Sequence, residues 1–362
     1  MKNTNNIKAV SVAVQAGVPV MLIGGPGIGK TSVIEQMAET LDLPIEVVIG
    51  SVREPSDFVG LPVVHNGQVK LAPPRWAENL VMEGKGVLLL DELSTSPPAT
   101  QSAQLRVVLD RVVGDLKLPD AVAIIACSNP PETTSGAFEL TAPMANRFVH
   151  LTWSHDHSEW CDGIVGGFQT PDIKSAKPGW KKNLHLSRAL ISSFIHARPS
   201  LLYQLPDNES EAGGPWASPR TWDMASKLHA AWETTGYSDD VLSILMAGTV
   251  GQTSAMEFLA YRDNLDLPNP EDLIKKPASL KLPERGDRVY AVLSSVTAAV
   301  LSNNTVDRWN AGWKVLGEAV TQGSADVAAS AAKALVKNRP NGAGLPVEVT
   351  HFVPLLKGAG LM

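Results

Sequence analysis

A glycine-rich segment near the start of the chain has the residue types needed to bind phosphate. Residues 24–31 read Gly-Gly-Pro-Gly-Ile-Gly-Lys-Thr, which fits the P-loop pattern of glycine, any four residues, then Gly-Lys-Thr. Glycines let the backbone turn so that its N–H groups face a phosphate, and the positive end of a following helix favours the same negative charge. The pattern predicts that Lys30 reaches the β- and γ-phosphates of a nucleotide and that Thr31 binds Mg²⁺. The expected nucleotide-binding residues are Gly25, Pro26, Gly27, Ile28, Gly29, Lys30, Thr31 and Ser32.

Two other readings of these glycines are disfavoured. A strand-to-helix turn that binds nothing would not need the full pattern in this context. A dinucleotide-binding fingerprint fits the spacing of Gly25 and Gly27, but Lys30 stands where its third glycine belongs.

Two adjacent carboxylates follow a later apolar run. Residues 87–90 read Val-Leu-Leu-Leu, and Asp91 and Glu92 come directly after them. Open parallel sheets bind ligands at the carboxyl ends of their strands, so Asp91 is expected to hold Mg²⁺ through water. Glu92 would orient and deprotonate the attacking water. Alone, the pattern also fits the plain end of a strand, but together with the P-loop it predicts ATP hydrolysis rather than nucleotide binding only.

These residues need a parallel sheet to position them. Short β-rich apolar runs separated by helical stretches occur at residues 20–23, 45–49, 87–90, 121–126 and 148–152. This alternation predicts an α/β core with a five-stranded parallel sheet covered on both faces. From residue 184 onward apolar residues recur at helical spacing. We therefore expect a core at residues 1–153, an all-helical lid at 154–264, and a linker with a helical C-terminal extension at 265–362.

Composition narrows the class of protein. The chain has 362 residues, 44% of them hydrophobic, and a formal net charge of −6. No block of Lys or Arg is long enough to predict a nucleic-acid partner. The polar N-terminus and the lack of an apolar run of about 20 residues predict neither export nor a membrane span. Only Cys127 and Cys161 are present, which fits a reducing cytoplasm.

Several motifs in a fixed order resemble the MoxR family of AAA+ ATPases. This family belongs to the wider group that includes cobaltochelatase, nitric-oxide-reductase and Rubisco-activating ATPase subunits. Besides the P-loop and the two carboxylates, the resemblance rests on residues 55–60 (Pro-Ser-Asp-Phe-Val-Gly), 97–103 (Pro-Pro-Ala-Thr-Gln-Ser-Ala), 128–130 (Ser-Asn-Pro), 146–148 (Asn-Arg-Phe) and 218–220 (Ser-Pro-Arg). Together these motifs are far more specific than a P-loop alone.

The resemblance implies roles for three further residues. Asn129 resembles the sensor 1 residue that helps to orient the attacking water. Arg147 resembles the arginine finger that reaches the γ-phosphate held by a neighbouring subunit. Arg220 resembles sensor 2, which contacts the phosphates of its own subunit. The expected catalytic residues are thus Glu92, Asn129, Arg147 and Arg220, and the Mg²⁺ residues are Thr31 and Asp91.

The chain departs from the family pattern at a few positions. The family usually has an aspartate where Asn146 stands, and an Asn-Arg pair where Ser94 and Thr95 follow Leu93. Arg106 and Arg111 receive no role from the resemblance.

Other patterns have more than one reading. Residues 63–71, with Asn66-Gly67 at the centre, predict a hairpin with a type I′ turn, and residues 111–118 predict a second hairpin. Both hairpins fit insertions of this family. For each of them, contact with a ring pore or a client and simple exposure to solvent are equal alternatives. His155, His157 and Cys161 have a spacing that could bind a metal, but a polar linker is favoured because no second cluster completes four ligands.

The resemblance implies a ring, expected to be a hexamer, that hydrolyses ATP between subunits and remodels, assembles or activates a protein client. A partner with a von Willebrand factor A domain is implied in the same way. The alternatives are an ATP-dependent regulatory switch or scaffold with slow hydrolysis, and a DNA-acting AAA+ protein, which the net charge of −6 disfavours.

Overall fold

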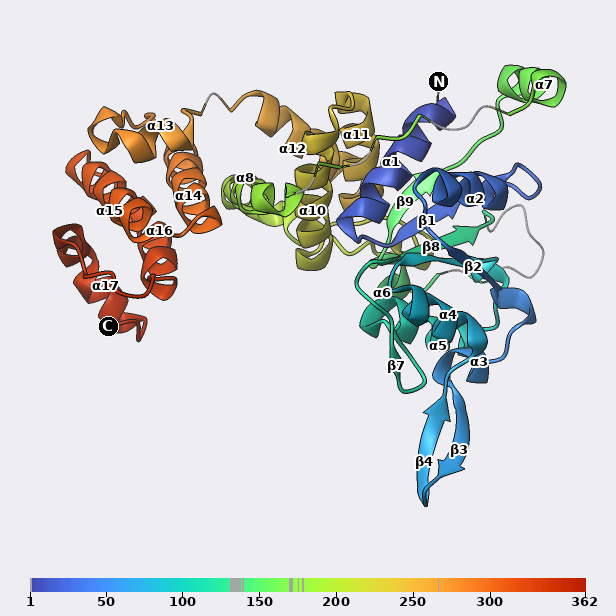
Figure 1. Ribbon diagram of the computed structural model, residues 1–362. Coiled ribbons are helices and arrows are strands. Elements are labelled where there is room, and N and C mark those ends of the chain that lie inside the picture. Colours follow the sequence, from blue (N-terminus) through green and yellow to red (C-terminus); the bar gives the residue numbers. More distant parts are fainter. Residues whose placement is uncertain are drawn as a thin grey trace. The chain divides into compact units, whose positions relative to one another are not determined.

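The computed structural model describes residues 2–130, 138, 140–168, 172–174, 176–177, 179–265 and 267–362. The chain forms two compact units (Figure 1). The first unit comprises Met1–Pro178 and Tyr203–Ala255, and the second comprises Gly179–Leu202 and Met256–Met362. The predicted lid at 154–264 is therefore shared between the two units, because its helices pack against different cores.

A five-stranded parallel sheet forms the centre of the first unit. Its strands are β1 (Val20–Ile23), β2 (Ile45–Ile49), β5 (Gly86–Asp91), β8 (Val122–Ser128) and β9 (Val149–Thr152). The spatial order is β2-β5-β8-β1-β9, and every pairing is parallel. The register pairs Ile49 with Asp91 and Ile23 with Ser128, so the carboxyl ends of neighbouring strands meet at one edge. The predicted α/β core with a five-stranded parallel sheet is confirmed.

Helices bury the apolar side chains of this sheet. The element order gives α1 (Lys2–Ala16), α2 (Lys30–Thr40), α3 (Ser56–Val59), α4 (Arg75–Glu83), α5 (Pro98–Asp110) and α6 (Ala142–Ala145). Helices α3, α4 and α5 contribute Phe58, Trp76 and Val107 to a core that also contains Leu88 and Leu90 of β5. All residues of β8 are buried, as expected for a strand covered on both faces.

Two hairpins interrupt the alternation of strands and helices. The first pairs β3 (Leu61–His65) with β4 (Gln68–Ala72), and the second pairs β6 (Val112–Val113) with β7 (Leu116–Lys117). Asn66 and Gly67 have φ values of 52° and 74°, as the predicted type I′ turn requires. Every residue of β3 is exposed, and the hairpin extends away from the sheet (Figure 1).

The base of the first hairpin is joined to the turn of the second. The Leu71 N–H donates to Asp115 Oδ2 at 2.9 Å, and the Asp115 N–H donates to the Leu71 carbonyl at 3.1 Å. Gly114 between them has φ 60°, and a Cβ there would stand 2.5 Å from the Leu71 carbonyl oxygen, so only glycine fits without a shift.

Further helices complete the first unit. They are α7 (His157–Gly166), α9 (Glu209–Ala212), α10 (Pro219–Thr235) and α11 (Asp239–Val250). His157 and Cys161, for which a polar linker was favoured over a metal site, lie on α7. Asp156 caps its first turn by accepting from the Glu159 N–H at 3.0 Å, a local signal typical of a helix start.

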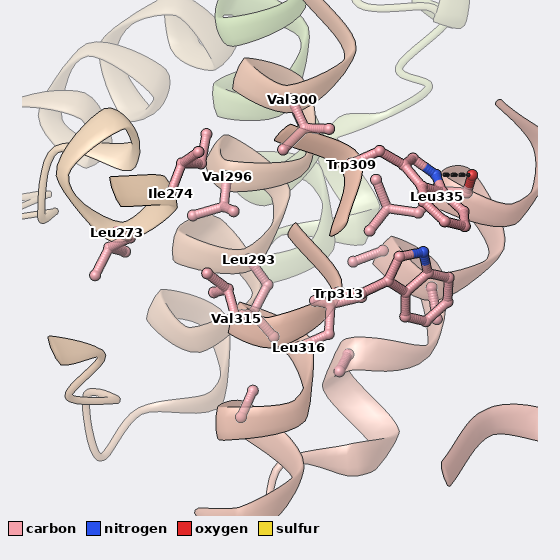
Figure 2. Packing of buried hydrophobic residues seen from close by; sticks show 14 of the residues in the cluster. Leu273, Ile274, Leu293, Val296, Val300, Trp309, Trp313, Val315, Leu316 and Leu335 are labelled. Carbon is pink, nitrogen blue, oxygen red and sulfur yellow. Dashed lines mark hydrogen bonds between the residues drawn. The ribbon is translucent and has the colours of Figure 1, made fainter. Parts of the chain in front are cut away.

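The second unit is helical. Its elements are the 3₁₀-helices η4 (Trp180–Asn183), η5 (Pro199–Leu201), η6 (Pro277–Ser279) and η7 (Val347–Phe352), with α8 (Leu184–Ala197), most of α12 (Gln252–Asp263), α13 (Pro270–Lys275), α14 (Gly286–Ser302), α15 (Val306–Thr321), α16 (Ala325–Lys337) and α17 (Val353–Gly358). Figure 2 shows its core around Trp309 and Trp313 of α15, which meet edge to face at 5.8 Å. The Trp309 indole N–H donates to the Leu335 carbonyl at 2.8 Å, which satisfies a polar group inside this core. Among the described residues, no helix combines the length and apolar character needed to cross a membrane.

Close packing of α11 on β9 generates a stability prediction. A Cβ at Gly248 would stand 2.2 Å from the His150 carbonyl oxygen. Gly248→Ala must therefore push α11 from the strand, and it should lower the free energy of unfolding of the first unit by about 1–3 kcal/mol. Thermal unfolding measures the loss. Gly286→Ala is the control, because no atom lies within 4 Å of a Cβ at this helical position; equal melting shifts for both variants would contradict the packing.

His150 generates a pH prediction. Its ring is buried, Nε2 donates to the Ala145 carbonyl at 2.8 Å, and Nδ1 has no hydrogen-bond partner among the described residues. Burial lowers the pKa of His150 to about 4, against the opposing effect of the Ala145 hydrogen bond. In the unfolded chain His150 binds a proton as the pH falls below about 6.5. In the folded chain it binds that proton only as the pH falls below about 4.

Stability should accordingly fall between pH 6.5 and 4, by up to roughly 3 kcal/mol from this group. Denaturant titrations across this range measure the slope. His150→Gln, which cannot titrate, should flatten that slope; a slope unchanged by the substitution would assign the pH dependence to other groups.

Candidate functional site

The P-loop joins the end of β1 to the start of α2. Gly27 and Gly29 have φ values of 73° and 83°, which glycine adopts without strain. Gly24 is required for another reason, because a Cβ there would stand 2.4 Å from the Trp153 carbonyl oxygen. The Trp153 indole N–H donates to the Ile28 carbonyl at 3.1 Å. Trp153, the residue that follows β9, thus holds the loop through this hydrogen bond.

The remaining residues of the predicted nucleotide-binding set lie along the same loop and the first turn of α2. No atom lies within 4 Å of a Cβ placed at Gly25, Gly27 or Gly29. Pro26 and Ser32 are exposed, and Ile28 is half-buried.

Lys30 is buried and makes three hydrogen bonds. Its Nζ donates to the carbonyls of Gly24 and Gly25 at 2.7 and 2.8 Å, and to Asn129 Oδ1 at 2.7 Å. Burial lowers the pKa of Lys30, while Cys127, Asp91 and Glu92 oppose this shift. The ammonium is thus surrounded by hydrogen-bond acceptors, and it connects the P-loop to Asn129, the residue that follows β8.

Asp91 and Glu92 lie at the carboxyl end of β5, beside the first turn of α2. Thr31 Oγ1 donates to Asp91 Oδ2 at 2.8 Å, and Asp91 Oδ1 accepts from the Glu92 N–H at 2.9 Å. Glu92 has a left-handed backbone (φ 55°, ψ 41°), which is uncommon for a residue with a side chain. The strand therefore ends in a turn that separates the two carboxylates, with Asp91 toward Thr31.

Ser51 is a site residue that sequence reasoning missed. It lies in the 3₁₀-helix η1 (Gly50–Val52), directly after β2, and its hydroxyl donates to Glu92 Oε2. The available signal was positional: a polar residue just past a predicted strand at residues 45–49. Because Ser51 holds the Glu92 carboxylate, it controls where that carboxylate points.

Asn129 lies directly after β8, at the same edge of the sheet. Its side chain accepts from Lys30, and its carbonyl accepts from Ser94 Oγ at 3.4 Å and from Ser128 Oγ at 3.2 Å. In the described part of the chain, no hydrogen bond joins the Asn129 side chain to Asp91 or Glu92. The structure thus brings this residue to the P-loop lysine.

Arg147 and Arg220 form a second group. Arg147 follows α6 and donates to the Pro143 carbonyl, and Arg220 is exposed in the first turn of α10. Burial lowers the pKa of Arg147, and so does the charge of Arg220, while Asp110 acts in the opposite direction. Over the described residues, no hydrogen bond or ion pair connects either arginine to Lys30, Asp91 or Glu92.

Arg111, which sequence reasoning left without a role, is structural. It ends α5 in the left-handed conformation (φ 56°), and its guanidinium donates to the carbonyls of Pro119, at 2.7 Å, and of Val122. It therefore fixes the second hairpin to the start of β8.

The buried thiol beneath the site gives a chemical prediction. Cys127 is fully buried in β8, and burial raises its pKa to about 12, so the thiolate that reacts with disulfide reagents is scarce. Cys161 on α7 is partly exposed. Titration of the native protein with a coloured disulfide reagent should show one fast thiol, and Cys161→Ser should remove it. Fast reaction of the Cys161→Ser protein would place Cys127 at the surface.

A protein-family model matches the segment of the chain that carries this site. Residues 19–150 match the model of the ATPase family associated with various cellular activities (AAA), a segment that runs from β1 into β9 and includes Lys30, Asp91, Glu92 and Asn129. A crystal structure from Cytophaga hutchinsonii, described as that of a candidate ATPase, is similar at 18% sequence identity with a TM-score of 0.45, over 70% of this chain and 88% of that chain. The parallel sheet and the matched segment together make residues 19–150 an α/β core of the AAA+ ATPase type, which mostly helical segments follow.

Proposed function

We propose that this protein is a MoxR-like AAA+ ATPase that hydrolyses ATP between the subunits of a ring and uses the reaction to remodel or activate a protein client. The observation that carries the ATPase part is that two hydrogen-bonded groups lie at the same edge of the sheet. Lys30 bonds the P-loop carbonyls and Asn129, and Asp91 accepts from Thr31 and from the Glu92 N–H. A phosphate-binding lysine and two differently held carboxylates are the groups that phosphoryl transfer to water needs.

Phosphate binding follows from the P-loop. Backbone N–H groups of residues 25 and 27–32 and the positive end of α2 attract the phosphates of ATP. Lys30 exchanges the carbonyls of Gly24 and Gly25 for phosphate oxygens, because an ammonium gains more from an anionic acceptor than from a neutral one. Its third partner, Asn129, keeps the lysine aligned during this exchange.

The hydroxyl of Thr31 and the carboxylate of Asp91 fit Mg²⁺, which prefers such oxygen ligands and retains several waters. When bound, Mg²⁺ neutralises charge on the β- and γ-phosphates. Among the described residues, no group of three or more His, Cys, Asp or Glu could hold a metal ion.

Glu92 is the proposed general base. Ser51 donates to one oxygen of the Glu92 carboxylate, and an ionised carboxylate has further lone pairs with which to take a proton from water. The Ser51 hydrogen bond thus orients Glu92 for this step.

The ring is supported by the position of Arg147. A charged guanidinium that stabilises the transition state must reach the γ-phosphate, and in the described part of this chain no hydrogen bond joins Arg147 to its own P-loop, while its guanidinium donates to the Pro143 carbonyl. A neighbouring subunit would supply the nucleotide that Arg147 contacts. A hexamer, a cytoplasmic location, a protein client and a partner with a von Willebrand factor A domain complete the proposal through the resemblance to the MoxR family.

Glu92→Gln and Lys30→Ala separate hydrolysis from binding. Glu92→Gln should lower the rate of phosphate release by roughly 10²–10⁴-fold, because the amide cannot take a proton, while retaining ATP binding. Lys30→Ala should weaken binding itself. Phosphate release and equilibrium binding of a fluorescent ATP analogue measure the two effects. Glu83→Gln, at the exposed end of α4, is the control, and full turnover by Glu92→Gln would remove Glu92 from the reaction.

A further inference from the structure

Helix α7 carries an apolar stripe that its own chain leaves uncovered. The stripe consists of Trp160, Ile164, Val165 and Phe168, which are 57%, 61%, 89% and 56% exposed. Gly163 is the buried residue of this helix, and a Cβ there would stand 2.3 Å from the Phe168 ring. In the described part of the chain, α7 packs extensively against no other helix or strand, and Figure 1 shows it apart from the sheet.

A helix of this length needs a surface to pack on. The helix α7 has ten residues, whereas an isolated helix shorter than about 12–15 residues is only marginally stable in water. Gly163 and Gly166 weaken it further, because glycine is the poorest helix former after proline. Most helical stability in proteins comes from packing of the apolar face. We therefore expect another surface to cover the stripe.

The chain anchors α7 on both sides. Before the helix, Asn6 Nδ2 donates to the Thr152 carbonyl at 2.6 Å. After the helix, Gln15 Nε2 donates to the Lys174 carbonyl at 3.1 Å. Both donors belong to α1, so the segment that carries α7 is attached twice to the same helix. Such an attachment lowers the ordering cost of binding, which favours a docking element.

The acidic side chains of this segment limit the kind of surface that can cover it. Asp156, Glu159 and Asp162 are acidic, and residues 153–168 contain no Lys or Arg. An anionic membrane surface would repel these carboxylates. The complementary surface is therefore cationic and also partly apolar.

The chain itself has such a surface at the start of its helical unit. Residues 173–206 contain no Asp or Glu, but they contain six basic residues: Lys174, Lys177, Lys181, Lys182, Arg188 and Arg198. We define the η4–α8 surface as Lys181, Lys182, His185 and Leu186, all of which are exposed. Leu186 supplies apolar area among the cations. This surface matches α7 in both charge and polarity.

We propose that α7 of one copy of this chain docks on the η4–α8 surface of a second copy. The apolar stripe then covers Leu186, and the acidic side chains of α7 approach Lys181 and Lys182. The contact joins neighbouring subunits of the proposed ring, so it rests on the proposed function. A second copy is favoured over an unrelated protein because every copy carries both halves of the contact, as a head-to-tail ring requires.

Cross-linking between differently tagged copies tests the contact. One copy keeps Cys161, which is partly exposed on α7, and the other carries Cys161→Ser together with His185→Cys. Cys127 is buried in both copies. When the copies are mixed with Mg-ATP, a short bismaleimide should join the two tags in one product. Glu83→Cys in place of His185→Cys, at the exposed end of α4, is the control and should give no such product.

The outcomes are distinct. A link within a single chain that carries both Cys161 and His185→Cys, with no product between chains, would assign the contact to one subunit and overturn the proposal. Oligomers that hydrolyse ATP but give no product overturn this contact and leave the proposed function intact. A product between the tags, from protein that releases no phosphate before cross-linking, supports the contact and refutes the proposed function.

Truncation of the stripe measures its contribution. Trp160→Ala should weaken self-association by about tenfold or more, because large aromatic side chains dominate the binding energy of interfaces. Its melting temperature should stay unchanged, since the Trp160 side chain is exposed within its own chain. Sedimentation velocity over a range of concentrations measures the association. Met82→Ala, which removes a side chain 78% exposed on α4, is the matched control; equal association of Trp160→Ala and wild type would contradict the docking.

Discussion

The buried ammonium of Lys30 is the interaction on which the site depends. Removing a charged amine from water is costly unless acceptors replace the lost water. The structure supplies two P-loop carbonyls and Asn129, which directly follows the neighbouring strand β8 at the same edge of the sheet. Because Lys30 needs acceptors from both the P-loop and Asn129, its burial constrains the conformation of the loop and also the register of β1 against β8.

The parallel register extends the same constraint to the carboxylates. Because β5 lies beside β8, Asp91 is placed next to the first turn of α2, where Thr31 contacts it. Trp153, which follows the edge strand β9, donates a hydrogen bond to the P-loop. Residues distant in sequence thus form one site because their strands all end at one edge, which is the general property of open parallel sheets.

Much of this could be predicted from the sequence, because the signals are local. The apolar runs at 20–23 and 45–49 coincide with β1 and β2, and the Asn66-Gly67 turn appears where its residue types require positive φ. The pairings Lys30–Asn129 and Thr31–Asp91 were not predicted as contacts, but they follow from strand order once the sheet is known.

Other features could not be predicted, because they depend on contacts between distant segments. Ser51 is an ordinary serine until η1 brings it to Glu92. The division of the predicted lid between two units depends on which core each helix packs against, and helical periodicity does not contain this information. The hydrogen bond from Ser218 Oγ to Asn146 Oδ1 at 2.7 Å joins the segments that carry Arg220 and Arg147, and in the sequence Asn146 appears only as a departure from a family pattern.

The measurement that tests the central claim most directly is phosphate release by the wild-type protein with Mg-ATP over a wide range of protein concentrations, with sedimentation velocity of the same samples. A site completed by a neighbouring subunit predicts that the rate per subunit rises with concentration in step with the oligomer. A constant rate per subunit down to concentrations at which only monomers sediment would contradict catalysis between subunits.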